Sequence, residues 1–172
     1  CYPANIPAIP AIPAIPFTSG ALEKLLMGGN KIKGVEAGKA LGDALATNTA
    51  LKELDLSNQG DYSHEKLDGA FAKEFAGGLG ANGALTSLNM SNNSIGELEL
   101  PEGWWIENKG YRDQKYVHTN GREQTEAPEG ARPVGAMALA DAIKTNGALV
   151  KFDISNNTVL AAGGQALAAA LK

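Results

Sequence analysis

A ten-residue segment that occurs three times constrains the fold of this chain more than any other feature. The copies begin at Ala50, Ala84 and Ala148 and read Ala-Leu-Lys-Glu-Leu-Asp-Leu-Ser-Asn-Gln, Ala-Leu-Thr-Ser-Leu-Asn-Met-Ser-Asn-Asn and Ala-Leu-Val-Lys-Phe-Asp-Ile-Ser-Asn-Asn. A less regular copy with the same apolar spacing begins at Ala21. Repeated units stack on one another because a single unit cannot bury its apolar side chains alone. We therefore predict a solenoid of about four repeats.

Each unit contains two apolar periodicities, one after the other. Leu51, Leu54 and Leu56 follow the spacing of a short strand with one buried face. Phe71 and Phe75 then stand four residues apart, like the buried stripe of a helix. Strand and helix units joined by right-handed connections place parallel strands on one side and helices on the other. The predicted fold class is α/β, a horseshoe with a parallel inner sheet and outer helices.

Three asparagines mark the expected ends of the helices. Asn48, Asn82 and Asn146 each lie two residues before the alanine that begins the next copy. Asparagine adopts the left-handed backbone conformation in which many helices end. We therefore expect positive φ angles at these three positions.

The order of these residues resembles the leucine-rich repeat, LxxLxLxxN, over residues 21–172. The long unit with a glycine before the helical stripe is similar to the ribonuclease-inhibitor-like class. It is also similar to repeats common in unicellular algae and other protists, which implies a eukaryotic source. The resemblance implies that Asn30, Asn93 and Asn157 form a ladder that bonds loop backbone groups between units. Gln59 stands at this position in the second unit, where we expect the adjacent Asn58 to substitute for it.

Two segments depart from the repeats. Residues 1–20 repeat Ile-Pro-Ala, which favours a polyproline II or disordered tail because proline lacks a backbone donor and fixes φ. Residues 96–132 interrupt the third unit of the repeat domain that spans residues 21–172. The chain begins without methionine and ends inside the fourth predicted helix, so we expect a fragment of a longer protein.

The interruption is rich in aromatic residues and predicts a small β insert. It contains both tryptophans of the chain. Asn120 and Gly121 lie between extended flanks, which predicts a two-residue hairpin with a type I′ turn, because both central residues of that turn have positive φ angles. We expect strands around residues 115–119 and 122–125.

The order Leu-Pro-Glu-Gly-Trp, aromatic hairpin and proline resembles a WW domain, which binds proline-rich peptides between aromatic side chains. Trp104 fits the first tryptophan and Tyr116 the hairpin aromatic residue, with His118 on the same face, whereas Thr125 stands where the second tryptophan is expected. The insert is either a degenerate peptide-binding site formed by Trp104, Tyr116 and His118, or a structural element whose aromatic side chains fold back onto the solenoid. The absent second platform predicts weak peptide binding at most.

No motif in the chain indicates catalysis. The two histidines, His64 and His118, have no evident nucleophile partner. Glu97 and Glu99 alternate in an extended segment, as solvent-exposed carboxylates do. The sequence contains no phosphate-binding loop and no pair of cysteines or histidines at metal-ligand spacing, and Cys1 is its only cysteine. We therefore expect no enzyme activity, no cofactor and no metal site.

Side chains between the buried leucines point out of the predicted sheet and form its inner, concave face. They fall into columns of small and polar residues, without the aromatic anchors typical of interface hot spots. Asp55, Asn89 and Asp153 form one column and are the strongest candidates for contact with a basic or polar partner. The predicted partner-binding residues of this face are Lys24, Glu53, Asp55, Ser87, Asn89, Lys151 and Asp153.

These features predict a non-catalytic module that binds a protein or peptide on the concave face, on the aromatic insert, or on both. One alternative is a regulator of a small GTPase, since the activating protein of the nuclear-transport GTPase has similar repeats, although no arginine precedes Arg112 here. Another is a purely structural part of a longer array. The uncovered last unit of such a piece favours self-association.

Composition argues against two classes of partner. The formal net charge of −4 does not indicate nucleic-acid binding. No apolar stretch reaches the roughly 18 residues of a membrane-spanning helix. A single cysteine is typical of a reducing compartment, so we expect an intracellular, cytoplasmic protein.

Overall fold

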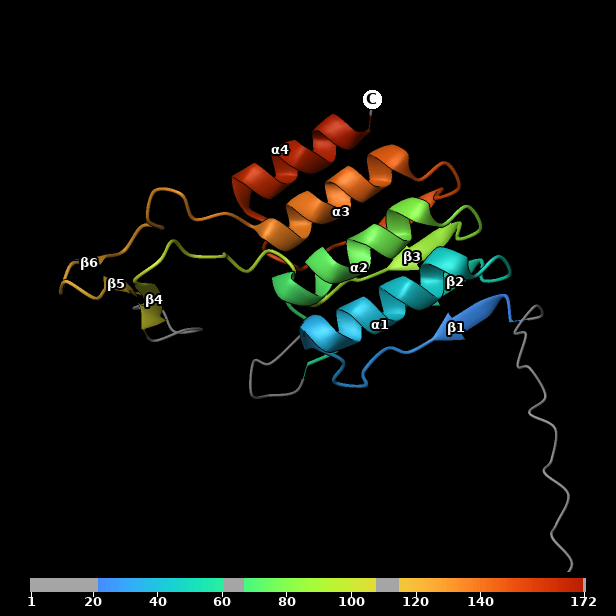
Figure 1. The fold of residues 1–172 in the computed structure, drawn as a ribbon, viewed down its shortest axis with the longest axis horizontal. Coiled ribbons are helices and arrows are strands. Elements are labelled where there is room, and N and C mark those ends of the chain that lie inside the picture. Colours follow the sequence, from blue (N-terminus) through green and yellow to red (C-terminus); the bar gives the residue numbers. More distant parts are fainter. Residues whose placement is uncertain (1–21, 61–66, 108–114, 172) are drawn as a thin grey trace, which may run out of the picture.

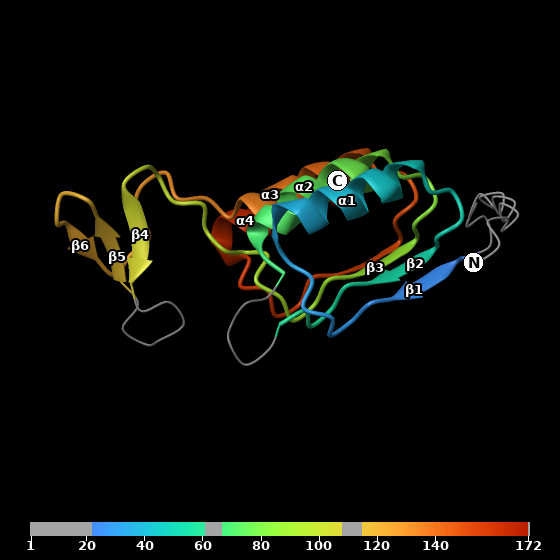
Figure 2. The same cartoon turned by 60° about the horizontal axis from the view of Figure 1, so that its bottom comes forward.

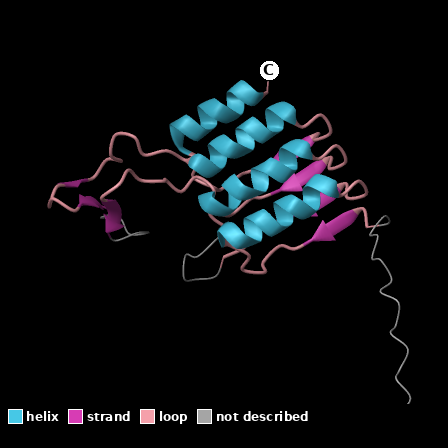
Figure 3. Cartoon of the chain, in the orientation of Figure 1, coloured by secondary structure: helices cyan, strands magenta, loops and turns pink. Residues whose placement is uncertain are grey.

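The computed structural model describes residues 22–60, 67–107 and 115–171. In these ranges four helices alternate with strands, and a further group of three strands precedes the third helix (Figures 1 and 3). The predictions for residues 1–20 and for His64 lie outside the described residues. The elements are β1 (Lys24–Leu26), α1 (Gly34–Thr47), β2 (Glu53–Asp55), α2 (Gly69–Ala81), β3 (Ser87–Asn89), β4 (Trp104–Glu107), β5 (Lys115–His118), β6 (Glu123–Gln124), α3 (Val134–Thr145), β7 (Lys151–Asp153) and α4 (Leu160–Ala170).

One parallel sheet has the strand order β1-β2-β3-β7. Leu25, Leu54, Leu88 and Phe152 are register partners at its centre, and the side chains of Leu54 and Leu88 are buried. The four helices α1 to α4 cover one face of this sheet, and the opposite face is open (Figure 2). The predicted α/β class with a parallel sheet is confirmed.

The hydrophobic core lies between the sheet and the middle helices. Phe71 and Phe75 on α2 are buried and stack with 5.7 Å between their ring centroids. Leu56 and Met90 approach them from the sheet side and are also buried. The central residues of the two outer strands are only partly buried. The outer strands therefore contribute less to the core than the two middle strands.

Neighbouring helices approach closely enough that only glycine fits at the contact. A Cβ atom on Gly78 of α2 would overlap the carbonyl group of Gly42 on α1. A Cβ atom on Gly135 of α3 would lie 2.6 Å from Cα of Gly69 on α2, well inside van der Waals distance. These glycines allow adjacent units to pack backbone against backbone.

The helices do not end in the left-handed conformation predicted at Asn48, Asn82 and Asn146. The φ angles of these residues are −78°, −78° and −76°, with ψ angles in the extended region. An extended residue directs the chain straight back toward the sheet. Each side-chain oxygen instead accepts the backbone N–H groups that lead into the next strand, for example those of Ala84 and Leu85 at 2.9 and 2.7 Å from Asn82.

The left-handed residues lie at the other end of each unit, after the strand. Gly29, Asn58, Asn92 and Asn156 occupy the same position after β1, β2, β3 and β7 and have φ angles of 76°, 51°, 58° and 57°. Glycine and asparagine adopt this conformation at little cost. The recurring Ser-Asn pair thus marks the turn that follows each strand rather than the end of a helix.

The strands β4, β5 and β6 form a separate antiparallel sheet, which lies beyond the helices rather than against them (Figures 1 and 2). Glu99 and Arg132 exchange two backbone hydrogen bonds, of 2.9 and 3.1 Å, where the two legs of the insert leave the main body. No described helix or strand of the main body packs on this sheet, and Trp105 is 45% exposed. The expectation that the aromatic side chains fold back onto the solenoid is wrong, because the paired legs carry the insert outward.

The turn between β5 and β6 also differs from the predicted type I′ turn. Gly121 has a φ angle of 83°, but Asn120 does not have a positive φ angle. The Gly121 N–H donates to the His118 carbonyl at 2.8 Å, and the His118 N–H donates to the Arg122 carbonyl at 2.9 Å. The connection is therefore a three-residue loop closed by a left-handed glycine. The Asn120 side chain holds this loop by accepting the Arg122 N–H at 3.0 Å.

Candidate partner-binding site

The register of the parallel sheet places the predicted concave residues in two adjacent rows on its open face. Within each strand these residues flank the buried central side chain, so they point the opposite way. The first row contains Lys24, Glu53, Ser87 and Lys151, and the second contains Leu26, Asp55, Asn89 and Asp153.

A shallow hollow of about 90 Å³ lies over these rows. Pockets for small organic ligands enclose roughly 300–1,000 Å³, so this hollow suits single side chains of a larger partner. Its lining residues are Glu53, Leu54, Asp55, Ser87, Leu88, Asn89, Lys151 and Asp153.

Three side chains of the second row have a structural role that the sequence analysis missed. The Oδ1 atoms of Asp55, Asn89 and Asp153 accept the backbone N–H group two residues later, over 2.8, 3.0 and 3.0 Å. Such bonds stabilise the turn that follows a strand. A signal was present in the sequence, since each of these residues is followed two positions later by serine. The backbone N–H groups therefore fix the orientation of these three side chains. The bond uses the Oδ1 atom only and does not involve the other terminal oxygen or nitrogen of each side chain.

The charges on the open face differ between its two ends. Lys24 Nζ lies 2.9 Å from Glu53 Oε1, so this ion pair offsets both charges at the β1 edge. At the β7 edge the Ser155 backbone N–H, and then the Ser155 hydroxyl, lower the pKa of Asp153, and the charge of Lys151 acts in the same direction. Asp153 is therefore ionised at neutral pH.

A ladder of side-chain amides joins the turns after the strands. Asn93 Nδ2 donates to the Leu56 carbonyl of the preceding unit at 2.9 Å. Asn157 Nδ2 donates to the Met90 carbonyl at 2.8 Å in the same way. Both asparagines are buried, whereas Asn30 at the start of the chain is exposed and bonds carbonyl groups of its own loop. Each buried rung ties one unit to the next.

Gln59 itself takes the ladder position in the second unit. Its Nε2 atom donates to the Met27 carbonyl at 2.6 Å, and its Oε1 atom accepts the N–H groups of Asn30 and Ile32 at 3.2 and 3.1 Å. The expected substitution by Asn58 is wrong, because Asn58 is the exposed, left-handed residue of the turn.

A second ladder, which sequence reasoning missed, lies at the C-terminal ends of the helices. Asn82 Nδ2 donates to the carbonyl groups of Leu45 and Asn48 at 2.7 and 2.8 Å. Asn146 Nδ2 repeats the pattern one unit later, with the carbonyl groups of Leu79 and Asn82 at 2.7 and 2.8 Å. The recurrence of asparagine two residues before each Ala-Leu pair was the available signal. The turns at both ends of each unit are thus fixed by amide side chains.

The insert places Trp104, Tyr116 and His118 on one face of its sheet, and Trp105 on the other. Its register pairs Trp104 with His118 and Ile106 with Tyr116, so all four share the first of these faces. The rings of Trp104 and His118 meet edge to face, with 5.0 Å between centroids. The Arg122 guanidinium lies 5.8 Å from the Trp104 ring, within range of a cation–π interaction. Tyr116 is buried, so Trp104 and His118 are the more accessible members of this group.

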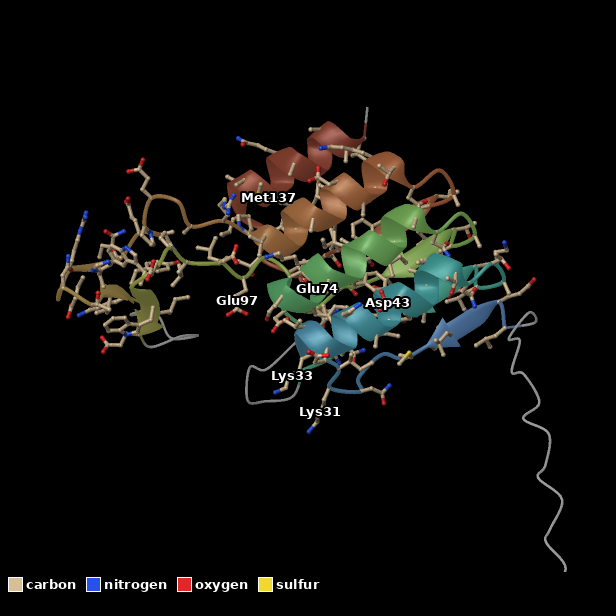
Figure 4. All side chains as sticks on the ribbon, viewed as in Figure 1. Lys31, Lys33, Asp43, Glu74, Glu97 and Met137 are labelled. Atoms are coloured by element: carbon tan, nitrogen blue, oxygen red, sulfur yellow. The ribbon has the colours of Figure 1, made fainter. Side chains whose placement is uncertain are left out.

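A larger hollow, of about 350 Å³, lies near the N-terminal ends of the helices and away from the open face. Figure 4 labels two of its carboxylates, Glu74 on α2 and Glu97 in the segment that leads into the insert. Glu99 lies 3.8 Å from Lys73 Nζ, and Asp68 caps α2 by accepting the Phe71 N–H at 2.8 Å. Two of the acidic residues around this hollow thus have structural partners.

Within the described ranges, no group of three or more histidine, cysteine or acidic side chains is arranged to hold a metal ion. No helix in these ranges has the length and apolar content needed to span a bilayer.

The sequence model of the family described as Leucine Rich Repeat matches residues 84–105, which contain β3 and the first residues of β4. These findings support a leucine-rich repeat protein. Among curated proteins, none matches this chain significantly in sequence.

Two solved structures are similar to this chain. Actin-binding site 2 of leiomodin-1 matches with a TM-score of 0.50 and 17% identity, over 87% of this chain and 63% of that one. The tropomodulin C-terminal domain of Caenorhabditis elegans matches with a TM-score of 0.40 and 15% identity, over 88% of this chain and 83% of that one. The chain thus spans less than two thirds of the leiomodin-1 structure, with which it shares the fold.

Proposed function

We propose that this leucine-rich repeat protein is a non-catalytic interaction module that binds a protein partner on the open face of its parallel sheet. The observation that carries the proposal is the shallow hollow over the two polar rows, which none of the described helices covers. Asp55 and Asn89 line it and are held by their bonds to the following turn. Pre-positioned polar side chains lose little conformational entropy when a partner binds.

The charge around this hollow favours a basic group of the partner. Glu53 is paired with Lys24, whereas Asp55 makes no ion pair among the described residues. A lysine or arginine side chain fits beside Asp55 and Asn89, where it meets one carboxylate and one amide oxygen. Such a contact supplies orientation and specificity more than overall affinity.

Two substitutions test this charge dependence without removing the turn. Asp55→Asn and Asn89→Asp both keep the side-chain oxygen that accepts the N–H two residues later. We expect Asp55→Asn to weaken, and Asn89→Asp to strengthen, binding of a partner captured from an extract, as measured by titration with the purified partner. Glu36→Gln on α1 is the matched control, because it removes one exposed charge on the helical side. Equal affinity for all four proteins would overturn the proposal.

Actin is the first purified partner to test. This chain shares its fold with the structure of actin-binding site 2 of leiomodin-1. Cosedimentation with filaments and titration with monomers distinguish binding to the two states of actin. If neither assay detects binding to actin, the partner of the open face is another protein. That protein is then identified by capture from the extract.

We further propose that the repeats are of the ribonuclease-inhibitor-like class. Each strand in the parallel sheet is followed by an α-helix of 11 to 14 residues, after the insert in the case of β3, which supports four repeats of the ribonuclease-inhibitor-like class arranged as a horseshoe. We place the protein inside a eukaryotic cell. The aromatic face of the insert, with Trp104, Tyr116 and His118, is the second proposed surface, and we propose that it is a degenerate WW-like site.

A further inference from the structure

The two ends of the parallel sheet are covered by helices of different character. α1 at one end carries Glu36 and an exposed ion pair, in which Lys39 Nζ and Asp43 Oδ2 are 2.7 Å apart. α4 forms the other end (Figure 1) and contains no charged residue over Leu160–Ala170. Leu160, the first residue of the helix, is 46% exposed, and Leu171, directly after its last residue, is 83% exposed. The outer face of α4 is therefore apolar, in the manner of a helix packed against a neighbour.

The strand beside α4 also has an unpaired edge. β7 is the last strand of its sheet. The Lys151 N–H donates to the Thr86 carbonyl at 2.9 Å, and the Asp153 carbonyl accepts the Met90 N–H at 2.8 Å, so both residues direct their backbone groups toward β3. Because these groups alternate along a strand, the N–H and carbonyl of Phe152 point to the free edge. An edge of this kind is a template for another strand.

We propose that a second copy of this chain covers this end, with the two β7 strands paired antiparallel about Phe152. A twofold axis perpendicular to the sheet then places Lys151 of each copy opposite Asp153 of the other. Residues two apart in a strand share a face, so both ion pairs form on the open face. The two Phe152 residues exchange a pair of N–H···O=C bonds, and the two α4 helices lie side by side under one continuous sheet.

The charges favour this arrangement over the other ways of joining two edges. If β1 of another copy continued the sheet in the existing register, Lys24 would stand opposite Lys151, and like charges in this position are destabilising. If two β1 strands paired antiparallel about Leu25, Lys24 would face Leu26, and Lys24 already has Glu53 as its partner. Of the two edges of the parallel sheet, the β7 edge is the one that is complementary in charge to itself.

Two single substitutions and their mixture test the proposed dimer. Lys151→Asp makes both facing residues acidic, and Asp153→Lys makes both basic. We expect each variant alone to dimerise at least about tenfold more weakly than the original chain, because two ion pairs become two repulsions. An equimolar mixture of the two variants restores the ion pairs between unlike copies, so we expect a heterodimer. Sedimentation velocity over a range of concentrations measures all four samples.

Controls separate the seam from folding and from the partner-binding face. Lys52→Asp changes the charge by the same amount as Lys151→Asp, but at an exposed residue outside β7. We expect this variant to dimerise like the original chain. Asp153→Asn keeps the side-chain bond to Ser155 and removes one charge of each pair, so its dimer is intermediate in strength. Leu171→Glu tests the helical side and weakens the dimer. The partner test above changes Asp55 and Asn89, so either proposal can fail alone.

The alternative results are distinct. A monomer at every concentration overturns the proposal, as does a dimer that none of these substitutions weakens. Association strengthened by Lys151→Asp overturns it in favour of end-to-end stacking, because the new carboxylate would then face Lys24. Variants that fail to associate when mixed, while circular dichroism shows them folded, overturn the antiparallel pairing.

Discussion

Gly78 of α2 packs directly against the backbone of Gly42 on α1, with no room for a side chain between them. Gly77, the preceding residue of the same helix, has open space where its Cβ atom would lie. Adjacent glycines in one helix therefore have opposite structural roles. One sets the separation of two units, and the other only lowers the stability of its helix.

Substitution of each glycine by alanine should change stability in opposite directions. We expect Gly77→Ala to raise the free energy of unfolding by about 0.5–1 kcal/mol, since alanine is the better helix former. We expect Gly78→Ala to lower it by about 1–3 kcal/mol, because α1 and α2 must move apart and the core beneath them loosens. Urea denaturation followed by circular dichroism measures both. Similar stabilisation by the two substitutions would contradict the close contact of the helices.

The amide ladder behind the strands predicts a graded cost of losing one rung. Asn93→Ala leaves the Leu56 carbonyl and the Gln59 N–H without their side-chain partner in the interior. We expect it to cost about 2–4 kcal/mol, since each buried backbone group left unpaired costs about 1–3 kcal/mol. Asn30→Ala removes bonds that are exposed, and we expect a loss below about 1 kcal/mol. Thermal melts of the two variants against the original chain make the comparison, and a larger loss for Asn30→Ala would refute the role of burial.

The strand–helix units could be predicted from sequence because their signals are local and repeated. Leu54 and Leu88 occupy equal positions in two copies, and the structure pairs them across the sheet. The same spacing puts Asp55 and Asn89 in one row, where they are also register partners. Repetition of this kind averages out the ambiguity of any single short strand.

The ends of the helices could not be predicted with the same certainty. Asparagine ends a helix either by adopting a left-handed conformation or by bonding the next backbone N–H groups through its side chain. Asn82 does the latter because the following strand begins only a few residues later. The position of the insert likewise depends on the pairing of Glu99 with Arg132, two residues far apart in sequence with no shared local pattern.

Asp153 should give a pH dependence with a definite sign. Its pKa in the folded chain is lowered, first by the Ser155 backbone N–H. A lowered pKa means that the ionised carboxylate contributes stability above its unfolded value, of about 3.9 for aspartate, and that this contribution is lost as the pH falls through the folded value. Titration of the side-chain carbon signal by NMR should place this pKa below the ordinary value. Ser155→Ala, which removes the hydroxyl bond and keeps the N–H, should raise it part of the way back, whereas Ser57→Ala in another unit should leave it unchanged.

The insert provides the sharpest test of its resemblance to a WW domain. The Trp104 ring already has His118 and Arg122 beside it, and Thr125 stands where a second aromatic platform is expected. We therefore expect proline-rich peptides to cause no saturable change in tryptophan fluorescence at low micromolar concentration. Thr125→Trp should supply the missing platform and improve peptide affinity at least about tenfold, since aromatic platforms supply much of the energy in such grooves. Thr119→Trp, on the exposed loop of the same sheet, controls for a non-specific effect of added tryptophan. Equal affinities for the two variants would contradict the resemblance, and tight binding by the original chain would contradict the predicted loss of function.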